Sequence, residues 1–378
     1  MRATRKSGRP DLFCCEPTVI AVQLIGVKAL SGSGTVMSDR PATIADVARG
    51  AGVSEATVSR ALRNLPHVRP EVRQRVRDAA AMLSYVADPN ASRLASGRTK
   101  TVGLIAPQLT TWFVNQVSAG LEDVLQPADH DLLISALSTS DRRRDLVSGN
   151  TNLNQRVDGV VVVDAFLGAS WQRSRSERPI VVVGERVDGE HTLGIDDALG
   201  SAMAARHLIE LGHKKLAVIG STNPRVRFSP VTNLRLAGFR GAVADAGLAA
   251  PREFVGEYTV ESGVLAGHAL FDLAVDERPS AVFCLSDEMA FGVLQAARER
   301  GVDVPHELAV VGFDDHSISE AFGLTTIHQP VRELGRRAAQ RMLDLVERGP
   351  GTPGHEMLRV ELVVRSSTTE IARAGRSR

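Results

Sequence analysis

The sequence predicts an α/β protein in which a small helical domain precedes a larger domain built on parallel sheets. Three observations indicate this fold class. Two short helical patterns are joined by a glycine near the front, basic charge is concentrated around them, and apolar runs alternate with amphipathic helical patterns behind them. With 378 residues, 43% hydrophobic and 24% charged, the chain is long enough for two or three domains with sizeable cores.

The front segment reads TIADVARGAGVSEATVSR from Thr43 and is typical of a helix-turn-helix. Thr43 and Asp46 have the spacing of a capping box, which predicts that a helix starts there. Gly52 can take the left-handed conformation that ends this helix, and Ser54 can cap the next one. Because the second helix of such a motif lies in the DNA major groove, we expect DNA binding. Ordinary helical packing is the alternative.

A third helix is predicted from Pro70, because proline suits the first helical position. Apolar residues at helical spacing then close a three-helix core: Val72, Val76, Ala79, Ala80 and Leu83.

Basic charge is concentrated in this part of the chain. Between Arg40 and Lys100, eleven basic residues stand against five acids, a balance of +6, whereas the whole chain carries +1. Such asymmetry is typical of a polyanion-binding module joined to a neutral domain. A solvated basic face is the alternative.

Residues 1–40 are expected to be a disordered or mis-called extension, with Met37 as the true start. The three cysteines lack metal-ligand spacing, so neither a zinc site nor a disulfide framework is expected. The apolar run 18–30 is interrupted by Gln23 and Lys28 and is too short to span a membrane. We expect a cytoplasmic protein without a cofactor, a bound metal or a membrane partner.

A hinge helix and linker are predicted over residues 88–100. Asp88 can cap the helix and Pro89 suits its first turn, but so short a helix is marginal alone. Leu94 is its only large apolar residue and has basic neighbours, a combination suited to wedging into a minor-groove step. A plain linker with one exposed leucine is the alternative.

The alternating patterns from Thr101 onward predict a parallel sheet with right-handed crossovers. Strands are expected at 102–106, 132–136, 159–163, 180–184, 216–220, 281–285 and 308–313. Helices are expected at 114–125, 200–211, 236–246, 263–273 and 288–300.

Polar residues at the carboxyl ends of these strands are the candidates for ligand binding, because open parallel sheets bind ligands there. They are Gln108, Glu185, Ser286, Asp287, Asp314 and Asp315. No phosphate-binding glycine loop, nucleophile elbow or metal-binding helix accompanies them, so no catalytic residue is assigned. They are interpreted as acceptors for a polyhydroxylated ligand or as helix caps, and Asp287 is expected to be a cap.

Taken together, these motifs resemble the LacI/GalR family of bacterial transcriptional repressors over about 330 residues, from Ala42 to Thr369. The matching segments are DVARGAGVSEATVSRAL, the Leu94 hinge, GIDDALGSAMAARHLIELGHKKLAVIG, RLAGF, SDEMAFG, VVGFDD, LTTIHQP and LVVRSST.

The resemblance implies a homodimer whose paired headpieces bind a pseudo-palindromic operator, with a small-molecule effector, a sugar or sugar derivative, between two lobes. Glu55, Ala56 and Arg60 would contact bases and Leu94 the minor groove. The full set of implied DNA contacts is Thr43, Ser54, Glu55, Ala56, Thr57, Ser59, Arg60, His67, Ala91 and Leu94. The implied effector contacts are Gln108, Trp112, Phe113, Glu185, Arg235, Tyr258, Ser286 and Asp314.

The resemblance also implies a domain division. A headpiece at 41–87 precedes an effector-binding and dimerisation domain at 101–370. Lobe one is expected at about 101–195 and 329–352, and lobe two at about 196–328 and 353–370.

The chain departs from the family pattern at several positions. Ala87 and Asp88 replace the proline and asparagine that usually open the hinge, and Gly184 stands where sugar-binding members have aspartate, which weakens a sugar-binding role for Glu185. No leucine-heptad tail follows Thr369, so a dimer is expected.

Four alternatives stay open. Arg235 could form a structural ion pair, and Glu55 could act on the helix dipole instead of a base. A transport-associated binding protein would share the two-lobed domain but would lack the helix-turn-helix. An enzyme acting on sugars would need a catalytic pair, which the sequence does not supply.

Overall fold

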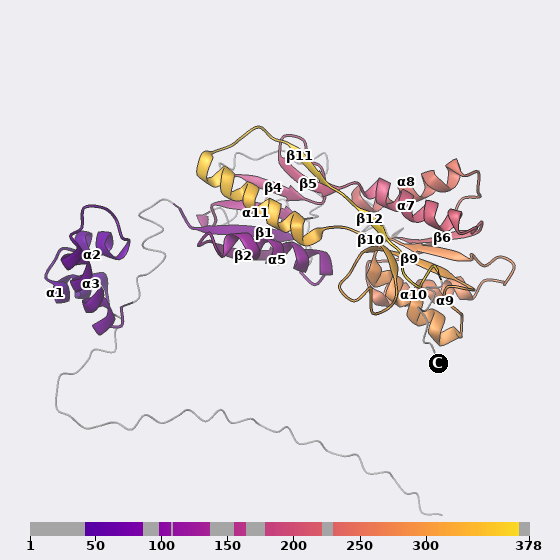
Figure 1. Cartoon of the computed structure of the whole chain (residues 1–378), viewed down its shortest axis with the longest axis horizontal. Helices are drawn as coiled ribbons and strands as arrows, with labels where there is room; N and C mark the ends of the chain where they lie inside the picture. The colour runs from indigo at the N-terminus through magenta and orange to yellow at the C-terminus, as the bar shows by residue number, and fades with distance from the viewer. Residues whose placement is uncertain are drawn as a thin grey trace, which may run out of the picture. The chain divides into compact units, whose positions relative to one another are not determined.

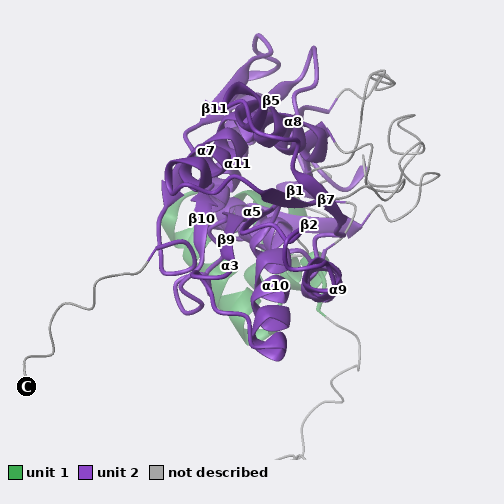
Figure 2. Cartoon of the chain, turned by 90° about the vertical axis from the view of Figure 1, so that its right-hand side faces the viewer, with its two compact units in different colours: residues 1–87 green, residues 88–378 purple. Residues whose placement is uncertain are grey.

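The structure is a computed structural model of the chain. It describes residues 42–85, 98–106, 109–136, 155–163, 178–220 and 230–369. The chain forms two compact units divided between Ala87 and Asp88, coloured separately in Figure 2. The expected extension 1–40, most of the hinge with Ala91 and Leu94, and Gln108 lie outside the described residues.

The first unit is a bundle of three helices. They are α1 (Ile44–Ala51), α2 (Glu55–Leu62) and α3 (Pro70–Met82). Val47, Val58 and Val76 contribute one fully buried side chain from each helix to its core. The predicted helix-turn-helix and the third helix beginning at Pro70 are confirmed.

Local sequence explains the ends of these helices. Thr43 donates its N–H to the Asp46 carboxylate at 2.9 Å and its hydroxyl to the same oxygen at 2.7 Å, while Asp46 N–H donates back to the Thr43 hydroxyl. Gly52 ends α1 with φ of 64°, a conformation that is open to glycine without strain. The Ser54 hydroxyl accepts from Thr57 N–H at 3.2 Å and so caps α2.

The second unit contains two sheets, shown with their helices in Figure 1. The strands of the first sheet are β1 (Thr101–Ala106), β2 (Asp131–Ala136), β3 (Gly159–Val163), β4 (Ile180–Val183), β5 (His191–Ile195) and β11 (His355–Leu358). Their order is β11-β5-β4-β3-β1-β2, and all neighbours pair in parallel. Helices α5 (Trp112–Leu125) and α11 (Val331–Arg348) pack against each other on this sheet.

The strands of the second sheet are β6 (Leu216–Gly220), β7 (Arg252–Val255), β8 (Ala281–Cys284), β9 (Ala309–Asp314), β10 (Thr325–His328) and β12 (Glu361–Val363). Their order is β12-β10-β9-β8-β6-β7. Four helices accompany this sheet: α7 (Asp197–Glu210), α8 (Pro230–Asp245), α9 (Val260–Phe271) and α10 (Asp287–Arg300). The pairing of β10 with β12 is antiparallel, which the expected all-parallel sheets did not include.

We call the first sheet with α5 and α11 lobe one, and the second sheet with α7 to α10 lobe two. The described chain passes between the lobes after β5, after β10 and after β11. The sequence-based division of the lobes is wrong for residues 355–358, because β11 pairs with β5 in lobe one. The last crossing therefore lies between Leu358 and Glu361.

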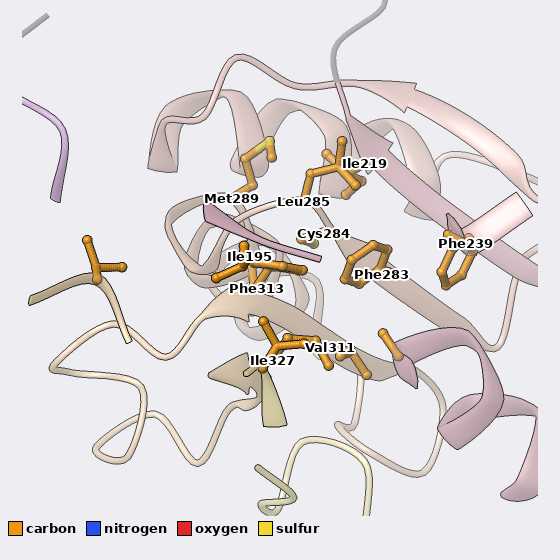
Figure 3. Close-up of a cluster of buried hydrophobic side chains, with 14 of the residues drawn as sticks. Ile195, Ile219, Phe239, Phe283, Cys284, Leu285, Met289, Val311, Phe313 and Ile327 are labelled. Atoms are coloured by element: carbon orange, nitrogen blue, oxygen red, sulfur yellow. The ribbon is translucent and has the colours of Figure 1, made fainter. Parts of the chain in front are cut away.

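Aromatic side chains fill the centre of lobe two. Phe239 and Phe283 stack with ring centroids 4.9 Å apart, and Phe313 lies 6.5 Å from Phe283. Figure 3 shows these rings beside Ile219 and Leu285. This rigid cluster supports the ends of β6, β8 and β9, where the candidate ligand-binding residues lie.

Candidate functional site

The exposed face of α2 is free to contact another molecule. Glu55, Ala56 and Arg60 are exposed, while Val58 and Ala61 on the opposite face are buried. Within the described part of the chain, Arg60 forms no hydrogen bond or ion pair, so its five donors are available. The three residues that the family resemblance implies as base contacts therefore share one accessible surface.

The neighbouring polar residues have mixed surroundings. The Ser54 and Thr57 hydroxyls lie 2.9 Å apart and share a hydrogen bond, and Ser59 is half-buried on the same helix. The Thr43 hydroxyl is engaged in the α1 cap, and His67 is exposed with φ of 71°. Ser54, Thr57 and Ser59 therefore belong to α2 or its cap, whereas Thr43 precedes α1 and His67 lies in the loop after α2.

Other basic residues of the first unit are used in holding it together. Arg73 donates to the Leu65 carbonyl at 3.1 Å, and Arg77 donates to the Asn64 side chain at 2.8 Å. Both bonds tie the loop after α2 to α3. The positive charge of this segment therefore has structural as well as surface roles.

In lobe two, Arg235 of α8 is the centre of a buried polar cluster. Its Nε donates to the Asp197 carboxylate at 2.7 Å, and its Nη1 donates to the Leu285 carbonyl at 2.6 Å. Nη1 also lies 3.6 Å from the Asp314 carboxylate, and the guanidinium carbon lies 3.6 Å from the centroid of the Phe313 ring. The expected ligand-binding arginine and acid, Arg235 and Asp314, are thus brought together.

Burial and charge oppose each other in this cluster. Burial lowers the pKa of Arg235, but Asp197 and Asp314 outweigh it and hold the guanidinium firmly protonated. Burial raises the pKa of Asp197 against the lowering effect of Arg235. Burial also raises the pKa of Asp314, which shares the same single cation and accepts from Gln329 at 2.5 Å.

Two candidate effector residues have left-handed backbone conformations. Asp314 has φ of 124° and Tyr258 has φ of 60°, values that side-chain-bearing residues rarely adopt. The Tyr258 hydroxyl lies 2.7 Å from the Thr232 hydroxyl of α8. Such strained residues are held in place by their surroundings and are typical of functional sites.

The lobes meet where α5 begins. The Trp112 ring lies 5.2 Å from the His316 ring of the loop after β9, and the Trp112 backbone N–H donates to the Glu288 carboxylate of α10. Burial raises the pKa of Glu288, and this hydrogen bond lowers it. The buried Trp112 Nε1 has no hydrogen-bond partner among the described residues. Its N–H is therefore an unsatisfied donor within the described part of the chain.

The expectation that Asp287 caps a helix is wrong. Ser286 is the N-cap of α10, and its hydroxyl accepts from Met289 N–H at 3.3 Å. Asp287 is the first helical residue, and its carboxylate accepts from the Ser319 and Thr326 hydroxyls, both at 2.6 Å. Burial raises its pKa to about 6 even though these donors lower it.

The remaining candidates are more scattered. Phe113 is half-buried and packs against the core beside Trp112. Glu185 is buried just after β4 in lobe one, whereas Arg235 belongs to lobe two. Asp315 pairs with Arg365 at 2.8 Å instead of standing free. The structure therefore groups Trp112 with His316 and Arg235 with Asp314, and it places Glu185 in lobe one, in the loop after β4.

Sequence reasoning missed several members of the site. Asp197, His316 and Gln329 all contact candidate residues. Asp197 belongs to the GIDDALG segment of the family resemblance. Asp196 caps α7 there, and Asp197 is the first residue of this helix and is buried. A helix-start pattern was available there. No local pattern marks the contact of His316 with Trp112.

The arrangement defines a class of protein: a helical DNA-binding unit joined to a two-sheet, ligand-binding unit. The model for the lacI family of bacterial regulatory proteins matches residues 43–88, and the model for a periplasmic binding protein-like domain matches 205–368. Catabolite control protein A of Priestia megaterium is 32% identical over 312 residues, 80% of this chain and 91% of that protein. The HTH-type transcriptional repressor CytR of Escherichia coli K12 is 31% identical over 339 residues, 86% and 96% of the two chains.

Solved structures show the same likeness. A lac repressor dimer bound to operator and the anti-inducer ONPF has a TM-score of 0.77 and 26% identity, covering 87% of this chain and 99% of that one. A transcriptional regulator CelR–cellobiose complex has a TM-score of 0.61 and 28% identity, covering 86% and 99%. The chain therefore belongs to the LacI family of DNA-binding transcriptional regulators.

No group of three or more His, Cys, Asp or Glu side chains is arranged to hold a metal ion in the described part of the chain. None of its helices is long and apolar enough to cross a membrane.

Proposed function

We propose that the chain acts as a dimeric repressor that binds a pseudo-palindromic operator and responds to a small molecule, a sugar or sugar derivative, held between its lobes. The observation that carries this proposal is that one chain combines an exposed, unpaired α2 face with a buried polar cluster at the strand ends of a two-lobed unit. The solved lac repressor dimer on its operator supports the assembly by likeness.

On the DNA side, Arg60 is suited to donate two hydrogen bonds to a guanine edge, and Glu55 to accept from a cytosine amino group. Glu55 also lies in the first turn of α2, where a negative charge favours the helix dipole. Operators with single substituted bases separate the two roles of Glu55. If Glu55 contacts a base, Glu55→Ala changes base preference at one position; an unchanged preference would assign Glu55 to the dipole.

The hinge role of Leu94 lies outside the described residues and is tested by its effect on DNA. A wedge forms only at the correct central step, so Leu94→Ala is expected to weaken operator binding far more than non-specific binding. Equal losses on operator and random DNA would show that residues 88–100 act only as a linker.

On the ligand side, the groups available suit a polyhydroxylated ring. The Asp314 carboxylate can accept from hydroxyls, and the Trp112 ring offers an apolar face with a free Nε1 donor. Nη2 of Arg235 has no hydrogen bond within the described residues and remains a donor. The cellobiose complex of a family member supports a sugar as the ligand.

A thermal-shift screen of sugars, nucleosides and sugar phosphates identifies the effector, because a ligand that binds the folded state raises its melting point. Calorimetry of the best compound with Arg235→Ala then tests Arg235. We expect a large loss of affinity. Unaltered affinity would assign Arg235 to its ion pair with Asp197 alone.

A gel-shift assay with DNA upstream of the chain's own gene separates this proposal from its alternatives. A repressor is expected to shift this fragment ahead of random DNA of the same length. A transport-associated binding protein or a sugar enzyme would bind neither with preference, and that result would overturn the proposal.

A further inference from the structure

A buried carboxylate fixes the chain where it enters the second unit. Asp158 directly precedes β3 and is 3% exposed. Its two oxygens accept from consecutive backbone groups: Thr99 N–H donates to Oδ1 and Lys100 N–H to Oδ2, both at 2.7 Å. The Arg178 guanidinium lies 3.8 Å from Oδ1. Charge-assisted bonds of this length are among the strongest in proteins.

The same short segment is held from other sides. Lys100 has φ of 50°, a left-handed conformation that a lysine adopts only where its surroundings impose it. Its carbonyl accepts from Asp131 N–H at 2.8 Å, and Arg98 donates to the Val346 carbonyl of α11 at 3.4 Å. Residues 98–100 are thus fixed to β2, β3 and α11 of lobe one.

The position of this attachment in the sheet links it to the candidate ligand site. Asp158 and Lys100 lie at the amino ends of β3 and β1, which are parallel neighbours. Trp112 follows β1 at the opposite, carboxyl edge of the sheet. Since both strands are buried along their whole length, they form a stiff connection between the two edges.

We propose that Asp158 is the positioning residue by which lobe one holds the linker to the DNA-binding unit. This inference rests on the proposed function. Within one chain, the covalent connection between the units runs through residues 98–100, so a movement of lobe one reaches the DNA-binding unit through them. Asp158 fixes the backbone of Thr99 and Lys100 to the amino end of β3.

The consequence for DNA binding follows from the need for two headpieces. Binding to an inverted repeat requires both headpieces to be held at a fixed spacing, whereas non-specific binding depends on phosphate contacts. Releasing residues 98–100 lengthens the tether and lowers the effective concentration of the second headpiece at its half-site. Loss of Asp158 should therefore reduce specific binding and leave non-specific binding nearly unchanged.

The test compares Asp158→Asn with Val161→Ala in the full-length chain. Asparagine keeps the shape of Asp158 but places an amide donor against one of the two backbone N–H groups. Val161 is a fully buried residue of β3, so its truncation loosens lobe one without touching residues 98–100. The probes are the duplex that wild-type protein selects from a random library and a scrambled duplex of equal length, at one salt concentration.

For Asp158→Asn we expect the ratio of specific to non-specific affinity to fall by about tenfold or more, with backbone amide exchange of Thr99 and Lys100 accelerated by a similar factor. For Val161→Ala we expect the affinity ratio and the amide exchange rates of Thr99 and Lys100 to stay within about twofold of wild type. Equal affinity ratios in the two variants, or a wild-type ratio in Asp158→Asn, would overturn the inference while the proposed function stands. A wild-type chain that selects no duplex would overturn the proposed function itself.

Discussion

Replacing Arg235 with methionine leaves buried carboxylates in lobe two without their cation. The side chains of Arg235 and Asp197 are 6% and 3% exposed and are joined by a 2.7 Å hydrogen-bonded ion pair. Removing one partner of such a pair typically costs about 3–5 kcal/mol, because the other charge stays buried. Methionine approximates the length of the lost side chain, so little of the loss should come from an empty cavity.

Two further contacts of Arg235 are lost in this variant. The Leu285 carbonyl loses a 2.6 Å donor and the Phe313 ring loses the cation above it. Each contributes about 1 kcal/mol, partly offset by packing of the thioether. We therefore expect the free energy of unfolding of the second unit to fall by about 4 kcal/mol near neutral pH.

The loss of stability in Arg235→Met should become larger as pH rises. Burial raises the pKa of Asp197, and in the variant Arg235 no longer opposes this effect. The folded state then holds a proton that the unfolded state releases, so stability falls as pH rises and the deficit shrinks as pH is lowered. Adding Asp197→Asn removes the unpaired charge and should recover more than half of the loss.

Urea unfolding followed by tryptophan fluorescence measures this change in the second unit alone, since both tryptophans, Trp112 and Trp171, belong to it. A fall below about 1 kcal/mol, the size of an ordinary surface change, would show that Arg235 does not stabilise a buried charge. So would a double variant no more stable than Arg235→Met.

Three further outcomes are expected. Gly52→Ala should destabilise the first unit by about 1 kcal/mol, because Gly52 has a left-handed φ of 64°. Gly50 lies inside α1, where an added Cβ meets only ordinary contacts, so Gly50→Ala should stabilise this unit by up to about 1 kcal/mol. Calorimetric melting measures both, and equal signs would contradict the assignment of the αL cap. Trp112→Phe removes the free Nε1 donor and should weaken binding of the best sugar from the thermal-shift screen about tenfold, with the free energy of unfolding changed by less than about 1 kcal/mol. Titration calorimetry measures the affinity and urea unfolding the stability. Unchanged affinity would show that Nε1 does not donate to the ligand. Because burial raises the pKa of Asp287 from 3.8 to about 6, its ionisation should lower stability as pH rises through that interval. Asp287→Asn should therefore show a smaller fall in melting temperature between these pH values. Melting temperatures of the variant and the wild type that fall in parallel with pH would contradict this expectation.

The first unit could be predicted from sequence because its signals are local. Thr43, Gly52, Ser54 and Pro70 each mark a helix end through their own backbone or side-chain chemistry, and the structure places all four as expected. The buried parallel strands β1, β3, β4, β6, β8 and β9 were equally recognisable as continuous apolar runs, although their ends shifted by a residue or so.

The missed elements lack such local signals. β5 contains a histidine, a threonine and a glycine, and β11 contains a histidine and a glutamate; pairing with neighbours makes them strands. α11 is an arginine-rich amphipathic helix whose apolar face packs against α5 and against β3, β4 and β5, so its place in the fold depends on those distant partners. The contacts of Arg235 with Asp197 and of Trp112 with His316 join residues far apart in sequence, so only the assembled fold shows them.

We propose that the first unit recognises a specific DNA sequence and that a ligand of the second unit changes this recognition. The most direct measurement is the ratio of affinities for a selected duplex and for calf-thymus DNA, taken with and without the effector found by thermal shift. We expect an inverted-repeat duplex to be preferred by about a thousandfold or more, and we expect this ratio to change when the effector is added. No preference for any duplex, or a ratio indifferent to every ligand that binds, would contradict this proposal.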